Sequence, residues 1–443
     1  IRPGSYARQL AEYRDSVGNT FFSAKAAALD QPAPPVARDG GALQLVVGDS
    51  LDLTGTLRLD ADEGDPAKAD DDGRGGRLDL SAERLRIVET LSAAAEGVVE
   101  VVASVLNRIA ADSILLGGTR SVLSDRTEVA PVASTVEIAG GLGLAGSEYL
   151  LLAKDQLAIG DNASLRSTGA ATDQSGGRLV VTGNSGSALV RVSRNGPVQI
   201  ERAAGAAPAG DLLIGNGAIL GASGSIVVDA AGTARSFGGF ELGPKTALAL
   251  GSRRIVLGAD QTGVLDGLAL NGSALDTVGS AAELRFRAGD ELLFAGTVAL
   301  GSVTDRPDSL TLDAPVIRTS GGSATLTAGE VTLRNSGALL AVAPAGGTGA
   351  LQLNAERVRF GGGDVALDGF NSATVTAARG VSADGEARLR SGADVTLSTP
   401  SLSGAAGSEL EIVAAGRSVL LTAPDATAPA DVSTPVGAAL SVD

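Results

Sequence analysis

The feature that most constrains the fold of this chain is a repeated unit of two short amphipathic segments joined by a corner. In Gly75 to Val88, GGRLDLSAERLRIV, apolar and polar residues alternate on both sides of the corner, which is the period of a half-buried strand. The same register returns at Leu351 to Phe360, LQLNAERVRF, with an identical Ala-Glu-Arg corner. The chain therefore repeats a strand, corner and strand.

Related units recur from Gly41 onward, and one full cycle takes roughly 20 to 27 residues, within the range of solenoid repeats. Their corners carry Glu-Arg, Gly-Glu or Asp with a neighbour. A two-residue β-hairpin would instead need Asn-Gly, Asp-Gly or Gly-Gly, because both central residues take positive φ. The corners thus favour a bend between the faces of a coil over a tight reversal.

We therefore predict an all-β fold with a single parallel β-helix (β-solenoid) over residues 41–421. Residues 1–40 are predicted as an irregular N-terminal cap or linker, and 422–443 as an extended tail rich in Ala, Pro and Thr. Aromatic residues make up only 2% of the chain, which suits a narrow cross-section filled by Ala, Val, Leu and Ile. Ala93 to Ala111 has some helix propensity, but its β-branched valines and Gly97 favour a strand.

Composition excludes several classes of function. The net charge of −16 disfavours binding to nucleic-acid phosphates or to anionic lipid surfaces. The chain has no Cys and no His, which removes thiolate chemistry and the commonest general base and metal ligand. Its apolar runs are short or interrupted by charges, so no transmembrane segment is predicted. Met is absent even at position 1, so we expect the chain to begin after an initiator or inside a longer precursor, as a processed or excised piece.

Four phrases in the repeats resemble the filamentous haemagglutinin family of large exoproteins, the secreted partners in two-partner secretion. They are LNRIAADSILLGGTRS (106–121), YLLLAKDQLAIGDNASLRSTG (149–169), ALVRVS (188–193) and DLLIGNGAILGASGSIVVDAAG (211–232). The resemblance implies a right-handed β-helical rod, an outer-membrane transporter as secretion partner, and a place outside a Gram-negative bacterium or on its outer-membrane surface. It also implies roles in adhesion, biofilm formation or contact-dependent competition. The Asn-rich entry motifs of the family's secretion domain are not visible, and no catalytic residues come with the resemblance.

One motif resembles a dinucleotide fingerprint. Gly141, Gly143 and Gly146 form GxGxxG after the strand-like TVEIAG, with Asp161 about 20 residues further on. The fingerprint needs a helix after the glycines, and the phrase AIGDNASL that follows returns to the pattern of the repeats. A Gly-rich corner is therefore the preferred interpretation.

An acidic stretch at 60–72, DADEGDPAKADDD, raises the question of calcium. Oxygen-rich loops suit this ion, yet the order of the carboxylates matches no EF-hand or nonapeptide calcium repeat. A solvated acidic insertion is the preferred interpretation. The acidic residues are Asp60, Asp62, Glu63, Asp65, Asp70, Asp71 and Asp72.

Parallel β-helices also include polysaccharide lyases and glycoside hydrolases, which use carboxylates and Arg on one outer face. Carboxylates are plentiful here, and arginines are available at Arg253, Arg254, Arg357 and Arg359. The chain has no Trp, however, and Tyr149 is the only tyrosine within the repeats, so the aromatic residues that stack on sugars are missing. An enzyme acting on acidic glycans is therefore the alternative hypothesis.

The preferred hypothesis is a secreted or cell-surface rod that is structural or adhesive and not an enzyme. We assign it no catalytic, cofactor-binding or metal residues and no cofactor. Self-association into filaments or layers is expected, since the unpaired edges of stacked strands favour it. Phe286, Phe294 and Phe360 are expected to point inward.

Overall fold

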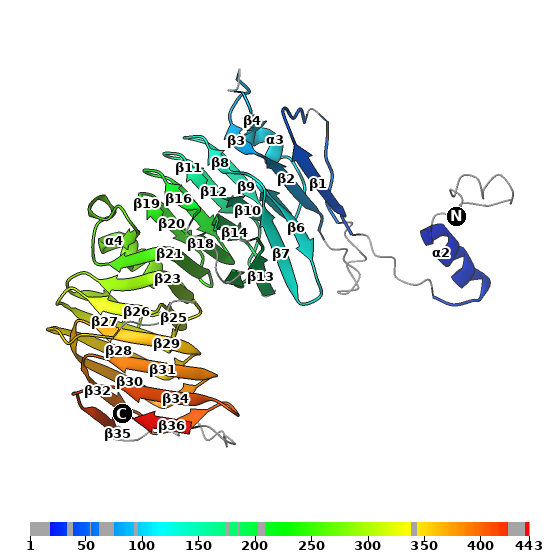
Figure 1. Ribbon diagram of the computed structural model, residues 1–443. Coiled ribbons are helices and arrows are strands. Elements are labelled where there is room, and N and C mark those ends of the chain that lie inside the picture. Colours follow the sequence, from blue (N-terminus) through cyan, green and yellow to red (C-terminus); the bar gives the residue numbers. More distant parts are fainter. Residues whose placement is uncertain are drawn as a thin grey trace, which may run out of the picture.

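The computed structural model describes residues 18–32, 39–53, 55–61, 75–92, 96–172, 177–183, 186–202, 209–337, 343–423 and 439–442. Within these residues the chain is all-β, with long and mainly parallel sheets. The strands follow one another along a curved stack from β1 to β36 (Figure 1).

The first half of the chain forms one side of a large sheet. Its strands there are β1 (Ala42–Val47), β2 (Arg77–Ala82), β5 (Ser113–Leu116), β10 (Glu148–Ala153), β14 (Ala188–Ser193) and β18 (Ser225–Ala230). Successive strands pair in parallel, except that β14 runs antiparallel between β10 and β18. The prediction of parallel pairing is therefore wrong for β14, and also for β6 (Gly118–Val122) and β7 (Arg126–Pro131), which pair antiparallel with each other.

Two smaller parallel sheets accompany the large one. The first contains β4 (Val99–Val102), β3 (Arg84–Val88), β8 (Thr135–Ile138), β11 (Gln156–Ile159), β16 (Asp211–Ile214) and β19 (Ala234–Ser236). The second contains β9 (Gly143–Gly146), β12 (Ser164–Ser167), β17 (Ile219–Ala222) and β20 (Gly239–Leu242). The chain visits the sheets in a fixed order, because β8, β9 and β10 are followed by β11 and β12, and later β16, β17 and β18 by β19 and β20.

A fourth sheet, called here the outer sheet, has no counterpart in the sequence prediction. It consists of β6 (Gly118–Val122), β7 (Arg126–Pro131), β13 (Gly177–Val181) and β15 (Val198–Arg202). It covers the outward face of the large sheet and encloses a second apolar core. That core is formed by Leu115, Val129, Leu150, Leu152, Leu179, Val181, Leu189, Ile200 and Val227. Here the chain therefore builds two layers where the sequence predicted one.

The second half of the described chain contains the longest strands of the fold, together with several short ones. These are β21 (Ala247–Leu257), β22 (Leu268–Leu270), β23 (Glu283–Phe294), β24 (Val298–Leu300), β25 (Ser309–Asp313), β26 (Val316–Thr319), β27 (Ser323–Arg334), β28 (Gly349–Phe360), β29 (Gly363–Asp368), β30 (Phe370–Ala383), β31 (Glu386–Ser391), β32 (Asp394–Ser398), β33 (Leu402–Gly404), β34 (Glu409–Val413), β35 (Val419–Thr422) and β36 (Ala439–Val442). All of their pairings are parallel. In Figure 1 they form the lower part of the stack, from green to red.

Four short helices complete the described chain: α2 (Gly18–Ala28), α3 (Ala103–Leu106), the 3-10 turn η1 (Gln261–Gly263) and α4 (Gly272–Gly279). In the ambiguous interval 93–111, Val99, Val101 and Val102 lie in β4 as expected, whereas Val105 lies in the helix α3 that follows directly. Two elements lie outside 41–421. Helix α2 falls in the predicted cap, and β36 falls in the predicted tail, where it pairs with β34.

The predicted corner is confirmed in the first copy of the repeat. Strands β2 and β3 flank Glu83 but pair with different strands, β2 with β1 and β5, and β3 with β4 and β8. The second copy differs in one respect, since β28 runs unbroken through its Ala-Glu-Arg corner. The irregularity there is a shift in register against β30 between Ala355 and Arg357. Neither corner is a hairpin.

The main core lies inside the stack and consists of columns of aligned apolar side chains. One column runs through Leu284, Leu310, Val331, Val358 and Val381, each paired with the next and at most 1% exposed. Phe286, Phe294 and Phe360 also lie in this core, as the alternation predicts. Each fully buried side chain of this size contributes about 1.5–3 kcal/mol, so the columns are the main source of stability.

Candidate functional site

The glycines that resemble a dinucleotide fingerprint lie at a corner. Gly141 has a φ of +75° between β8 and β9, and Gly143 and Gly146 are the first and last residues of strand β9. The next element, β10, is also a strand. Because no helix N-terminus follows the glycines to receive a pyrophosphate, the interpretation as a Gly-rich corner is confirmed.

Most of the acidic stretch 60–72 lies outside the described residues, which include only Asp60 and Ala61 of it. Over the described ranges, no group of three or more acidic side chains is placed to hold a metal ion. No helix in those ranges is long and apolar enough to cross a membrane.

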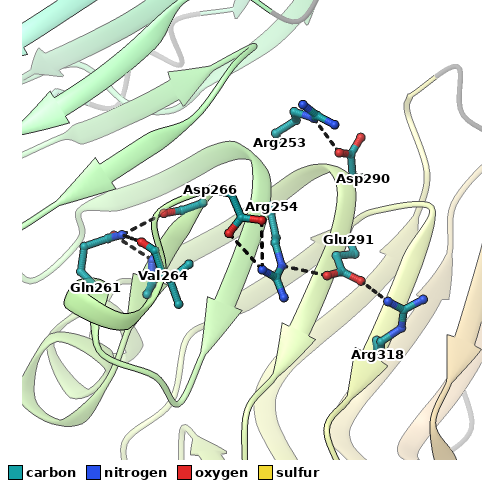
Figure 2. A network of polar contacts seen from close by, with 10 residues as sticks. Arg253, Arg254, Gln261, Val264, Asp266, Asp290, Glu291 and Arg318 are labelled. Atoms are coloured by element: carbon teal, nitrogen blue, oxygen red, sulfur yellow. Dashed lines mark hydrogen bonds and ion pairs between the residues drawn. The ribbon is translucent and has the colours of Figure 1, made fainter.

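One of the arginines proposed for the enzyme alternative, Arg254, belongs to a ladder of ion pairs on the outside of the stack (Figure 2). Arg254 Nε donates to Glu291 Oε1 at 2.8 Å, and Arg318 Nη1 donates to Glu291 Oε2 at 2.6 Å. Arg318 Nε also donates to Asp368 Oδ2 at 2.6 Å. The ladder joins four neighbouring strands, β21, β23, β26 and β29, and opposite charges on adjacent strands stabilise a sheet.

Two of the remaining arginines of that hypothesis, Arg253 and Arg359, are also paired with carboxylates. Arg253 Nε lies 2.6 Å from Asp290 Oδ2, as Figure 2 shows, and Arg359 Nη2 lies 3.6 Å from Glu330 Oε1. Arg357 is two residues from Arg359 on the same strand, β28. These arginines are spread over different strands, so the structure does not bring them together around one carboxylate pair.

A second group of charges lies buried between the outer sheet and the large sheet. Asp79 of β2 accepts from Arg120 of β6 at 2.6 Å, and Asp229 of β18 accepts from Arg202 of β15 at 2.7 Å. Asp229 also accepts from Arg287 at 2.5 Å. Burial alone would raise the pKa of Asp229, but Arg202 and Arg287 outweigh it and hold the pKa well below its usual range.

Glu148 is held by a similar pair within the large sheet. Its Oε2 lies 2.6 Å from Arg191 Nη2, and Ser113 Oγ donates to its Oε1 at 2.6 Å. Burial raises the pKa of Glu148, whereas Arg191, Ser113 and Arg120 lower it. Their combined effect is larger than that of burial, so the net shift of the pKa is downward. Sequence reasoning missed these pairs, although a charge within an apolar run, as in ALVRVS and SIVVDA, is a readable signal of a buried ion pair.

A groove lies beside β15, where the outer sheet ends. Its volume is about 590 Å³. One wall is formed by Val198 and Gln199, and the floor is the outward face of β21, β23, β25 and β27. We call this feature the β15 groove. Its polar floor includes Glu283 and Arg285, and the pKa of Glu283 is raised by partial burial and by neighbouring Asp308.

No aromatic side chain lines the β15 groove among the described residues. Tyr149, the single tyrosine of the repeats, is 1% exposed in the core, and its pKa is raised by burial. Its hydroxyl lies 3.4 Å from Asn107 Oδ1. The one tyrosine of the repeats is therefore inside the stack, away from the groove.

Comparison of the chain with protein-family models, with curated proteins and with solved structures found no match.

Proposed function

We propose that this chain is a non-catalytic β-solenoid rod, with the three sheets as the faces of a right-handed parallel β-helix. The fixed order in which the chain visits the sheets supports this proposal. The parallel register between successive visits and the continuous apolar columns support it too. In such a fold each repeat is stabilised by its neighbours, which yields a stiff, elongated body.

One observation carries the functional part of the proposal. The outer charges of the rod are used to join strands, as in the ladder from Arg254 through Glu291 and Arg318 to Asp368. A carboxylate held by arginines on both sides is a poor proton donor, because each guanidinium stabilises its ionised form. The charges therefore serve the rigidity of the rod, which is what a projecting or scaffolding protein requires.

The resemblance to filamentous haemagglutinin exoproteins supplies the biological setting of the proposal. On this basis the rod is secreted through an outer-membrane transporter of the two-partner type and acts outside the cell or on the surface of a Gram-negative bacterium. There it associates with copies of itself and contributes to attachment or biofilm formation.

Self-association has a candidate contact surface at the last described coil. Leu421 of β35 pairs with Leu397, which is fully buried, yet Leu421 is 46% exposed. An apolar column that is covered on one side only gains free energy when another copy stacks against it, by about 25 cal/mol per Å² of apolar surface buried.

Electron microscopy and sedimentation of the purified chain test this function. We expect filaments or layers, and we expect Leu421→Glu to reduce them. Leu265→Glu is the matched control, since Leu265 is 70% exposed in a loop away from that coil. Monodisperse chains that cleave acidic polysaccharides would overturn the proposal in favour of a β-helical lyase or hydrolase.

A further inference from the structure

The outer sheet ends at a strand with a free edge. Within the described residues β15 pairs with β13 on one side, and no strand pairs with its other side. In a parallel strand the N–H and C=O groups of alternate residues point to the same edge. The free edge of β15 therefore presents a row of donors and acceptors, and this row faces the β15 groove.

Beneath this edge the large sheet continues for several more strands. Val227 of β18 lies under the outer sheet and is 2% exposed. The same row of paired residues continues with Ala249, Arg285 and Thr311. All three residues line the groove. The outer sheet thus ends at β15, while the floor beneath it continues for several strands.

We propose that the β15 groove binds an extended segment of a partner protein, which adds to β15 as a fifth strand of the outer sheet. Strand addition to an open edge supplies main-chain hydrogen bonds, and the floor supplies contacts for alternate side chains. The proposal does not depend on the rod's self-association, because it concerns a different surface.

The floor also limits what kind of partner fits. A strand that belongs to a two-layered body would bring its second layer to the place already occupied by β23 and β25, since stacked sheets lie about 10 Å apart. A second copy of this chain could not offer its own β15 for that reason. The occupant is therefore a single extended segment, such as a tail or a long loop.

The charges on the floor specify the side chains of that segment. Glu283 lies beside Asp308, and over the described ranges no ion pair neutralises Glu283. Ala249 lies one strand away and two residues further along the strand direction, in register with Arg285. A segment with a Lys or Arg two residues from a small apolar residue would place the cation at Glu283 and the apolar group over Ala249.

Fluorescence anisotropy with a labelled peptide, Thr-Lys-Thr-Val-Thr-Val-Thr, tests the proposal. We expect saturable binding to the full chain. Two derivatives keep the side chains but carry backbone N-methyl groups, one on the Lys and Val residues and the other on the Thr residues. Because only one of these two sets faces β15, one derivative should lose binding at least about tenfold, whereas the other should bind like the parent peptide. Equal behaviour of the two derivatives would overturn the proposal.

A variant of the floor tests the charge. Glu283→Gln should weaken binding of the Lys peptide by about threefold and leave a peptide with Gln in place of Lys unaffected. Glu89→Gln, an exposed carboxylate in the turn after β3, is the matched control and should change neither affinity. Binding of the Lys peptide that is insensitive to Glu283→Gln would show that this carboxylate does not select the segment. Self-association, measured without peptide, separates failure here from failure of the proposed function.

Discussion

Asp229 shows what keeps a charge inside this fold. The residue is 2% exposed and lies between Arg202 of the outer sheet and Arg287 of β23. A buried ion pair adds little to stability compared with apolar packing, but the loss of one partner leaves the other charge buried and uncompensated. Asp229 therefore links the two layers through its ion pairs.

The first prediction concerns the ion pairs of Asp229. Asp229→Asn should destabilise the chain by about 3–5 kcal/mol at neutral pH, since two guanidinium groups lose their counter-charge. Urea unfolding measures the effect. Asp266→Asn is the control, because Asp266 is largely exposed beside Arg254, and we expect a cost of less than about 1 kcal/mol. Similar losses of unfolding free energy for the two variants would contradict the conclusion that Asp229 links the two layers.

The same residue gives a pH dependence with a definite sign. The pKa of folded Asp229 lies below its unfolded value of about 3.9. Its contribution to stability is therefore complete above about pH 5 and is lost as the pH falls through the unfolded value towards the folded one. The difference in unfolding free energy between the wild type and Asp229→Asn should narrow as the pH is lowered from 5 to 3. A constant difference over this range would contradict the lowered pKa.

At the scale of the element, the outer sheet buries the outward-pointing side chains of the strands beneath it. Leu150 of β10 points away from the main core, yet it is 2% exposed because the outer sheet covers it. Thr311 of β25 lies in the same outward row, beyond the end of the outer sheet. Equivalent positions in the two halves of the stack therefore have different environments.

A pair of alanine variants compares these environments. Leu150→Ala should cost about 2–5 kcal/mol, as expected for a large side chain removed from a packed core. Thr311→Ala should change the free energy of unfolding by less than about 0.5 kcal/mol, the usual range for surface positions. Chemical denaturation measures both. A neutral Leu150→Ala would mean that the outer sheet does not pack on β10.

Much of the fold could be predicted from this alternation, because a period of two residues fixes which side chains point inward. The corner at Glu83, the buried phenylalanines and the parallel pairing on either side of β25 all follow from it. The outer sheet could not be predicted in the same way, since β7, β13 and β15 pair across intervening strands that belong to the other sheets. One local signal exists, because SILL and YLLLA are apolar without alternation, which is typical of strands covered on both faces.

The β15 groove was beyond sequence reasoning for a related reason. Its wall belongs to β15 and its floor to strands that begin with β21, so it exists only where a long-range packing arrangement ends. None of Glu283, Arg285 or Gln199 belongs to a local motif. Such a site depends on the length of one sheet relative to another.

At the scale of the whole molecule, net charge should oppose the proposed self-association. The chain carries 51 acidic and 35 basic residues, so copies repel one another at long range. Raising the ionic strength from about 0.01 to 0.15 M shortens the screening length from about 30 to 8 Å. We expect light scattering to show stronger self-association over this range, whereas weaker association would indicate contacts made mainly by ion pairs.

The antiparallel strand β14 gives this repetitive array a fixed reference point. A stack of similar coils can in principle pair one repeat out of step, because each coil offers its neighbour nearly the same edge. Strand β14 separates β10 from β18 and pairs with both in the opposite direction, an arrangement that no other described strand of the stack can replace. A chain that slipped by one repeat would leave β14 without a matching site. The antiparallel pairing of β14 thus sets the alignment of the parallel strands on either side.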